Sequence, residues 1–340
     1  MKKVMAVYDE DPIYAERLSD YVNRKEKGIF QAQAFTSKEK LEAFSKEHKI
    51  DLLLTGETAG TGETDRVLSG QRIYLSEDKS AGTTDEARRE IYKYQSGDDI
   101  IREVMACYCE VPGALEAFPR LKNAAKRMIG VYSPVGRCGK TSFSLSMGQI
   151  LAREEKVLFV TLDTFTGFCQ LVDERWKRDL SDLIYYYKRG RFNAIRLNSV
   201  VYFLGNMAWL PPIRFPDDYN QISPEEMALL FNTILDESDY ETLLLDVGDY
   251  GKRVLPLLEI CQCIYMPVKE DPVSQAKVKE FEEYVDDCGK RPLKARIRKL
   301  HVPLTAGNRP AGRFPEELMW GDLGDFTRGI IKGNNHIWES

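Results

Sequence analysis

The segment VYSPVGRCGKTSFS, residues 131–144, constrains the fold most strongly, because it joins an apolar run to a helix-forming run through a turn of small residues. Gly139, Lys140 and Thr141 match the end of the phosphate-binding pattern G-x-x-x-x-G-K-[ST], while Pro134 occupies the place of its opening glycine. Such loops place backbone N–H groups and the start of a helix around a polyphosphate. The segment therefore predicts a strand–loop–helix unit that binds phosphate.

Apolar runs and helical runs alternate along the chain after residue 127. Short apolar runs predict strands, and apolar residues spaced three or four apart predict helices. Strands are expected at 127–133, 156–163, 199–205, 240–248 and 263–268, with helices at 140–154, 180–189, 223–237, 254–260 and 273–287. After residue 205 we expect an apolar loop that contains Trp209. This alternation predicts a parallel sheet with helices on both faces.

The first hundred residues alternate in the same way. Strands are expected at 4–7, 29–36, 51–56 and 71–76, with helices at 13–24, 38–48 and 96–108. Residues 109–127 contain two prolines and a cluster of basic residues, which break the alternation. A chain of 340 residues is long enough for two domains. We therefore predict an α/β chain with one domain at 1–110, a linker at 111–127 and a second domain at 128–340.

Composition excludes several classes of function. The net charge of −5 argues against a protein that coats nucleic acid through bulk electrostatics. The seven cysteines include no C-x-x-C pair and the three histidines lie far apart, so zinc sites and His-based catalysis have little support. No apolar run approaches the roughly 18 residues of a membrane span, and acidic residues follow the first strand before a signal-peptide core could form. These features predict a cytoplasmic protein without a stable membrane anchor.

Two predicted strands of the second domain end in aspartates. Asp246 ends the run YETLLLD, where it could hold magnesium as the acid of a Walker B strand does. Asp163 ends KVLFVTLD, the strand directly after the loop helix, where its carboxylate could face a γ-phosphate and the attacking water. A solvated turn aspartate is the alternative for each position.

The predicted site binds ATP and Mg²⁺. Its candidate nucleotide-binding residues are Gly136, Arg137, Cys138, Gly139, Lys140, Thr141 and Ser142. Thr141, Asp163 and Asp246 are the candidate magnesium ligands, and Lys140 and Asp163 are the candidate catalytic residues.

The order of loop, helix and aspartate-ended strand resembles the deviant Walker A ATPases of the MinD/ParA family, whose patterns read K-G-G-x-G-K-[TS] and D-x-D-x-x-x-G. The chain keeps the pattern at Gly136, Gly139, Lys140, Thr141, Asp163 and Gly167. It departs at Val135 in place of the signature lysine, at Arg137 in place of the second glycine and at Thr161 in place of the first aspartate. The resemblance implies a P-loop NTPase fold, an ATP-bound homodimer and, because of these departures, weak or slow hydrolysis.

The first domain resembles the receiver of response regulators, a doubly wound, flavodoxin-like fold. Asp9 and Asp11 follow the first strand, and Lys93 matches the lysine position of that family. Thr55 or Gly56 stands where the phosphoacceptor aspartate belongs, and Glu57 is one residue out of place. Without that carboxylate, phosphorylation has no nucleophile. The resemblance implies a docking or dimerisation module rather than a phosphorylation switch.

A receiver-like domain followed by a MinD/ParA-type ATPase resembles proteins of the TadZ/CpaE type. The resemblance covers nearly the whole chain. It implies a homodimer that organises Tad (Flp) pilus machinery at a cell pole and that binds pilus assembly proteins or other polar proteins.

Two alternatives come from the same family. A ParA-like partition or regulatory ATPase would bind DNA through the basic stretches at 294–299 and 187–191. A MinD-like membrane protein would need a basic amphipathic C-terminal helix, and we expect Gly329 and Gly333 to interrupt the run that carries Phe326, Ile330 and Ile331. Solvated basic residues are the simpler interpretation of the two basic stretches.

Arg137 could compensate for the missing lysine. Its guanidinium can contact phosphate oxygens in a bidentate way, which a lysine cannot do. We therefore expect Arg137 to stabilise bound ATP, either in its own site or across a dimer. The alternative is a solvent-facing arginine that only aids solubility.

Overall fold

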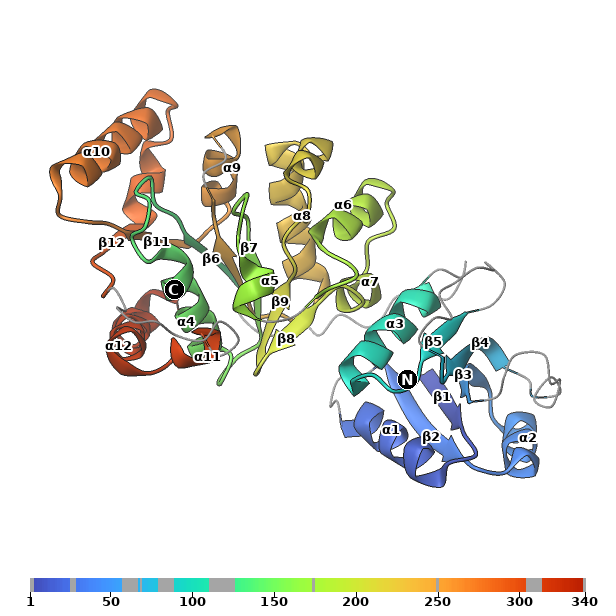
Figure 1. Cartoon of the computed structure of the whole chain (residues 1–340). Coiled ribbons are helices and arrows are strands. Elements are labelled where there is room, and N and C mark those ends of the chain that lie inside the picture. The colour runs from blue at the N-terminus through green and yellow to red at the C-terminus, as the bar shows by residue number, and fades with distance from the viewer. Residues whose placement is uncertain are drawn as a thin grey trace. The chain divides into compact units, whose positions relative to one another are not determined.

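A computed structural model describes residues 3–24, 29–56, 67, 69–78, 89–109, 126–172, 175–248, 251–303 and 314–338. The chain divides into two compact units, Met1–Phe118 and Pro119–Ser340 (Figure 1). The division falls inside the stretch 111–127 that we expected as a linker, most of which lies outside the described residues. Both units are α/β, as the sequence predicts.

The first unit is built on a parallel sheet in the order β2-β1-β3-β4-β5, the flavodoxin-like strand order. Its strands are β1 (Lys3–Tyr8), β2 (Phe30–Phe35), β3 (Ile50–Thr55), β4 (Ser69–Ser76) and β5 (Glu90–Tyr92). Its helices are α1 (Pro12–Arg24), α2 (Lys38–Glu47) and α3 (Gly97–Cys109). Strand β5 has only three residues and was not predicted, because so short a run carries no clear periodicity.

The connections of this sheet place α1 and α2 on opposite faces. The chain moves outward from β1 to β2 and then back past β1 to β3. Because parallel crossovers are right-handed as a rule, this reversal of direction puts the two connecting helices on opposite faces. On the α2 face, Leu41 and Phe44 pack against Ala6, Tyr8 and Phe35 of the strands. Helices α1 and α3 contact each other on the other face. Both faces of the sheet are therefore covered, as the doubly wound prediction requires.

A buried ion pair lies at the carboxyl end of this sheet. Lys93, directly after β5, places its Nζ 3.1 Å from Asp9 Oδ2 after β1, and also 3.1 Å from Glu77 Oε1. Burial alone would lower the pKa of Lys93, but the hydrogen bonds to Glu77 and Asp9 raise it above its usual value. A Cβ at Gly56 would lie 2.3 Å from Asp9 Oδ2, so the pair fills the space beside this glycine. Asp11 instead accepts the N–H of Ile13 and caps α1.

The second unit has a seven-stranded sheet in the order β12-β11-β6-β10-β7-β9-β8. Among the strand pairs of the described residues in this sheet, β8–β9 is the antiparallel one and the others are parallel. The strands are β6 (Arg127–Val131), β7 (Val157–Thr161), β8 (Tyr202–Leu204), β9 (Met207–Leu210), β10 (Thr242–Asp246), β11 (Cys263–Pro267) and β12 (Ile297–Leu300).

Helices cover both faces of this sheet (Figure 1). They are α4 (Lys140–Leu151), α5 (Phe168–Leu171), α6 (Leu180–Lys188), α7 (Ala194–Asn198), α8 (Pro224–Glu237), α9 (Val254–Glu259), α10 (Pro272–Asp287), α11 (Phe314–Glu317) and α12 (Gly321–Trp338). Successive residues of β10 point to opposite faces: Leu243 and Leu245 pack in the core under α8, α9 and α10, whereas Leu244 packs in the core under α4 and α12. This two-faced burial explains the continuous apolar runs of the central strands.

Two predictions for the segment 199–210 are wrong. The strand expected at 199–205 begins only at Tyr202, and the residues expected as an apolar loop form β9, with Trp209 1% exposed. Gly205, with φ +58°, and Asn206 form the turn of a hairpin between β8 and β9. Glycine and asparagine favour tight hairpin turns, so the signal was present in the sequence.

The C-terminal run also differs from expectation. Helix α12 continues through Gly329 and Gly333, since each glycine costs only about 1 kcal/mol in a helix and tertiary burial offsets that cost. Phe326 packs edge-on against Phe143 of α4, and Ile330 and Ile331 pack on the same core. These apolar side chains are thus engaged within the unit. Among the described helices, none combines the length and the hydropathy that a membrane crossing requires.

We predict that Lys93→Met destabilises the first unit by about 3–5 kcal/mol, because Asp9 would keep a buried charge without its cation. Since the pKa of Lys93 is raised, the stability that its own charge contributes is present at neutral pH and is lost as the pH rises from about 10 through the raised value. Urea unfolding followed by far-UV circular dichroism measures the effect.

The matched control for this prediction is Lys49→Met, because Lys49 is exposed and lies 3.9 Å from Asp51. Tryptophan fluorescence should not change in either variant. All four tryptophans belong to the second unit, namely Trp176, Trp209, Trp320 and Trp338. Equal circular dichroism transitions in the two variants would contradict the prediction.

Candidate functional site

Three adjacent parallel strands bring the predicted site residues to one edge of the second sheet. Asp246, the last residue of β10, lies level with Val131 of β6 on one side and with Thr161 of β7 on the other. The loop 132–139 leaves β6 at this edge, and Asp163 follows β7 two residues after Thr161. Segments far apart in the sequence thus meet where parallel strands end, which is where ligands bind in open α/β sheets.

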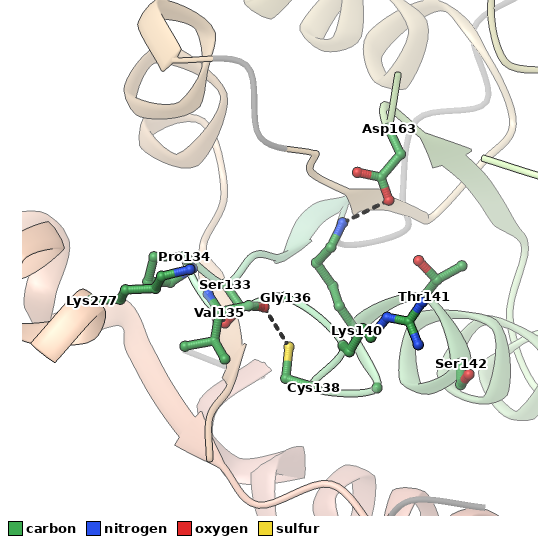
Figure 2. A pocket seen from close by; sticks show the side chains of 12 residues that line it. Ser133, Pro134, Val135, Gly136, Cys138, Lys140, Thr141, Ser142, Asp163 and Lys277 are labelled. Carbon is green, nitrogen blue, oxygen red and sulfur yellow. Dashed lines mark hydrogen bonds and ion pairs between the residues drawn. The ribbon is translucent and has the colours of Figure 1, made fainter. Parts of the chain in front are cut away.

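The first half of the loop is anchored to the core. Ser133 Oγ donates to Pro267 O at 2.6 Å and accepts the N–H of Val135 at 3.0 Å. The thiol of Cys138 donates to Val135 O at 3.0 Å (Figure 2). Val135 and Cys138 are both buried in the core under α8, α9 and α10. The residue at the position of the signature lysine is therefore a core anchor of the loop and carries no charge.

The second half of the loop adopts left-handed backbone conformations. Gly139 has φ +82° and precedes α4 without any side-chain cap. The N–H groups of the first turn of α4 therefore lack a side-chain acceptor, which makes this helix start suitable for an anion. Arg137 is the one non-glycine with positive φ, at +54°, among the described residues. A left-handed arginine costs roughly 1–2 kcal/mol relative to ordinary backbone, and the family pattern has glycine at this position.

Asp246 is fully buried and accepts three hydrogen bonds. Lys140 Nζ donates to Oδ1 at 3.0 Å, Thr141 Oγ1 to Oδ2 at 2.9 Å, and Thr161 Oγ1 to Oδ2 at 3.2 Å. Thr161 stands where the family pattern has its first aspartate. A carboxylate at that position would face Asp246 directly, whereas the threonine hydroxyl donates to it. The solvated-turn alternative for Asp246 is thus wrong.

Lys140 bridges both aspartates of the site. Its Nζ also contacts Asp163 Oδ2 at 3.1 Å (Figure 2). The same Nζ donates to Val247 O at 3.0 Å. Burial alone would lower the pKa of Lys140, but the charges of Asp246 and Asp163 outweigh it and raise the pKa above its usual value. Lys140 therefore stays protonated at neutral pH. Asp163, unlike Asp246, is part-exposed and lines the cavity described next.

A cavity of about 530 Å³ lies over the loop. Every candidate nucleotide-binding residue from Gly136 to Ser142 lines it, together with Asp163. Asp246 lies beneath Lys140 and Thr141 rather than in the wall. Lys277 of α10 also lines the cavity (Figure 2). Sequence reasoning missed Lys277, because it is one of several lysines in a charged helix and belongs to no motif.

The oxygen donors of the site suit magnesium. Thr141 lines the cavity, and its Oγ1 lies 2.9 Å from Oδ2 of the buried Asp246. Hydroxyl and carboxylate oxygens are the ligands that Mg²⁺ prefers. No group of three or more His, Cys, Asp or Glu side chains with metal-binding geometry occurs within the described ranges. A magnesium ion here would therefore take its remaining ligands from phosphate oxygens and water, as Mg²⁺ usually does.

The charged side chains of the basic stretch 294–299 are engaged in contacts inside the unit. Lys294 pairs with Asp286 and Lys299 with Glu282, each at 2.6 Å. Arg296 donates to two backbone carbonyls of the segment 259–261. In the other stretch, Lys188 donates to Gln221 O. Paired charges of this kind attract phosphates less strongly than free ones.

Comparison with known proteins gives structural neighbours only. No protein-family model and no curated protein matches the sequence. A plasmid partition protein from Borrelia burgdorferi B31, solved with AMPPNP, is 18% identical, covers 62% of this chain and 90% of its own, and has a TM-score of 0.43. A ParA family ATPase from Chlorobium tepidum TLS is 18% identical, covers 52% of this chain and 73% of its own, and has a TM-score of 0.45. MinD from Pyrococcus horikoshii OT3, solved with Mg-ADP, is 15% identical, covers 52% of this chain and 68% of its own, and has a TM-score of 0.40.

We predict that Gly248→Ala destabilises the ligand-free second unit by about 1–3 kcal/mol, the usual range for overpacking. The new Cβ would lie 2.6 Å from Asp163 Oδ1 and 2.6 Å from Leu162 O, so the segment that carries Asp163 must move. Gly136→Ala is the matched control, because its Cβ meets no atom within 4 Å. Urea unfolding followed by tryptophan fluorescence should separate the two variants, and equal midpoints would refute the predicted clash.

Proposed function

We propose that this chain is a P-loop ATPase that binds ATP with Mg²⁺ in the cavity over residues 133–142. The observation that carries the proposal is the buried carboxylate of Asp246, which holds both the loop lysine and the loop threonine. A helix start without a side-chain cap, a protonated lysine and a threonine–aspartate pair are together the groups that a magnesium–polyphosphate ligand needs. An ordinary strand–turn–helix connection does not require all of them at one edge of a sheet.

The residues would act on the nucleotide in distinct ways. The loop N–H groups would bind phosphate oxygens, and Lys140 would exchange part of its contact with the carboxylates for the phosphates. Thr141 and Asp246 would hold Mg²⁺ directly or through water. The metal would neutralise phosphate charge and orient the phosphates. Asp163, which lines the cavity, would face the attacking water.

Hydrolysis is proposed to be slow. Thr161 replaces one acidic group of the family pattern and donates to Asp246, so it cannot accept a proton from water as a carboxylate could. The remaining carboxylate, Asp163, is held by Lys140 at 3.1 Å, and this contact competes with a hydrogen bond from Asp163 to the attacking water. A site that binds ATP tightly and turns it over slowly suits a protein whose ATP-bound form performs the function.

The first unit is proposed to be a receiver-like docking module without phosphorylation. Its strand order and the pair Asp9–Lys93 at the carboxyl end of the sheet support this assignment. Neither Thr55 nor Gly56 offers a carboxylate at the acceptor position, and Asp9 already occupies the space beside Gly56. Glu57 lies outside the described residues.

The biological role that we propose is that of the TadZ/CpaE type: an ATP-bound homodimer that places pilus machinery or other polar proteins at a cell pole. The domain combination supports this role. Phe165 is 88% exposed two residues beyond Asp163, and a second copy could cover this ring when ATP is bound.

A ParA-like partition or regulatory ATPase is the alternative, because the loop and both aspartates suit that role equally well. It requires DNA contacts. The basic stretch 294–299 is paired with Asp286 and Glu282, which makes it a weaker DNA contact than the sequence suggested. Salt-sensitive retention on DNA would favour the alternative.

We predict that Lys140→Ala lowers the affinity for MgATP about 10- to 150-fold, the range expected when one hydrogen-bonded charge is lost. Isothermal titration calorimetry with and without magnesium measures this effect, and Lys279→Ala on the exposed side of α10 is the control. Thermal unfolding of the apoprotein checks that the variant is folded. Unchanged affinity, or binding by the parent protein that does not depend on magnesium, would overturn the proposal.

We predict that Arg137→Ala and Arg137→Gly both lower ATP affinity, by about tenfold for one charge-assisted contact, while turnover does not fall in parallel. Only the glycine variant should gain apoprotein stability, by about 1 kcal/mol, because only glycine relieves the left-handed strain. Calorimetry, phosphate release and the dimer fraction measure the effect of removing the arginine charge. Thermal unfolding measures the effect of relieving the backbone strain. If affinity, turnover and dimer fraction match the parent in both variants, Arg137 is a solvent-facing residue.

A further inference from the structure

A second cation reaches the nucleotide cavity from outside the loop. Lys277 of α10 lines the same cavity as Pro134, Val135 and Gly136, and Figure 2 shows its side chain extending from the helix toward the start of the loop. Lys277 is exposed, and no hydrogen bond or ion pair engages it within the described part of the chain. By contrast, Lys279 on the same helix pairs with Glu283 at 3.8 Å.

The position of α10 relative to the loop is fixed by packing. The helix is capped by Asp271, whose Oδ1 accepts the N–H of Ser274 at 3.0 Å. Val278 and Phe281, on the face opposite to solvent, lie in the core of the unit. The ring of Phe281 packs 5.0 Å from the ring of Tyr132, the residue that leads from β6 into the loop. This ring contact joins the helix to the start of the loop. It therefore keeps Lys277, one turn away on the same helix, beside the loop.

Without a further cation, the charged groups around Lys140 carry a net negative charge. Lys140 is the only loop lysine, and two carboxylates, Asp163 and Asp246, already contact it. These three groups sum to one negative charge, which repels a polyphosphate. Val135 is buried and adds no charge. Arg137 and Lys277 are the two cations of the lining that no carboxylate engages among the described residues, and together they make the local balance positive.

We infer that Lys277 binds phosphate oxygens of the nucleotide within its own chain, supplying from α10 a positive charge that the loop lacks at Val135. This inference rests on the proposed ATP binding. It assigns a phosphate contact to a helix more than a hundred residues beyond the loop in the sequence. A lysine at the mouth of an anion site, on a fixed helix and without a competing carboxylate, contributes to binding without a large desolvation cost.

The test compares Lys277→Ala with Lys279→Ala, two lysine deletions on one helix that differ in whether the side chain lines the cavity. Calorimetry with MgATP at low and at raised ionic strength should show about a tenfold loss of affinity for Lys277→Ala at low salt, and a smaller loss at high salt. Lys279→Ala should match the parent. Lys277→Arg should recover most of the affinity, because it keeps the charge. A charge reversal, Lys277→Glu, should lower affinity further than the alanine does.

The outcomes distinguish this inference from the proposed function. If the parent binds MgATP and Lys140→Ala weakens binding while Lys277→Ala binds like Lys279→Ala, ATP binding stands and the role of Lys277 is overturned. If Lys277→Arg is as weak as Lys277→Ala, the charge is not the cause and the inference also fails. If the parent binds no MgATP, both are overturned. Unchanged thermal unfolding of all four variants of α10 confirms that affinity, and not folding, has been measured.

Discussion

The buried carboxylate of Asp246 is the interaction on which the site depends. A charge with no solvent exposure is costly unless donors satisfy it, and here an ammonium and two hydroxyl groups do so. The donors come from the first turn of α4 and from the end of β7. Three segments are thereby joined at one point, so the loop between β6 and α4 has little freedom of its own. The cavity above it is preorganised by a network that lies beneath it.

This network also shapes the chemistry of the site. Lys140 is held by two carboxylates, and under the proposed function an incoming phosphate would compete with them for its charge. A ligand that brings its own magnesium ion resolves that competition, since the metal can take over the carboxylates while the lysine takes the phosphates. Thr161 keeps Asp246 satisfied without adding a third negative charge. Under the proposed function, the departures of this chain from the MinD/ParA pattern would favour holding a nucleotide over cleaving it.

Much of the fold was legible in the sequence, because parallel strands buried on both faces leave continuous apolar runs. The runs that became β6, β7, β10 and β11 were expected at nearly their observed places, and so was the helix that follows the loop. Two of the elements of the second unit that were not predicted correctly were missed for physical reasons. Strand β12 lies at the sheet edge, where the adjacent residues Arg298 and Lys299 interrupt the apolar pattern. Helix α12 tolerates its glycines because α4 packs against its apolar side, and no local propensity reports such a contact.

The sequence by itself determined the elements whose signals are local: the strand–loop–helix unit, the aspartates that end two strands, and the absence of a carboxylate at residues 55 and 56. These depend on spacing along a few residues. Only the tertiary structure decided that Val135 is buried in the core and that acidic residues form ion pairs with the basic stretch 294–299. It also decided that Lys277 lies beside the loop. Those facts depend on contacts between segments far apart in the chain. Strand order and helix packing set such contacts, and neither is encoded in the periodicity of a single segment.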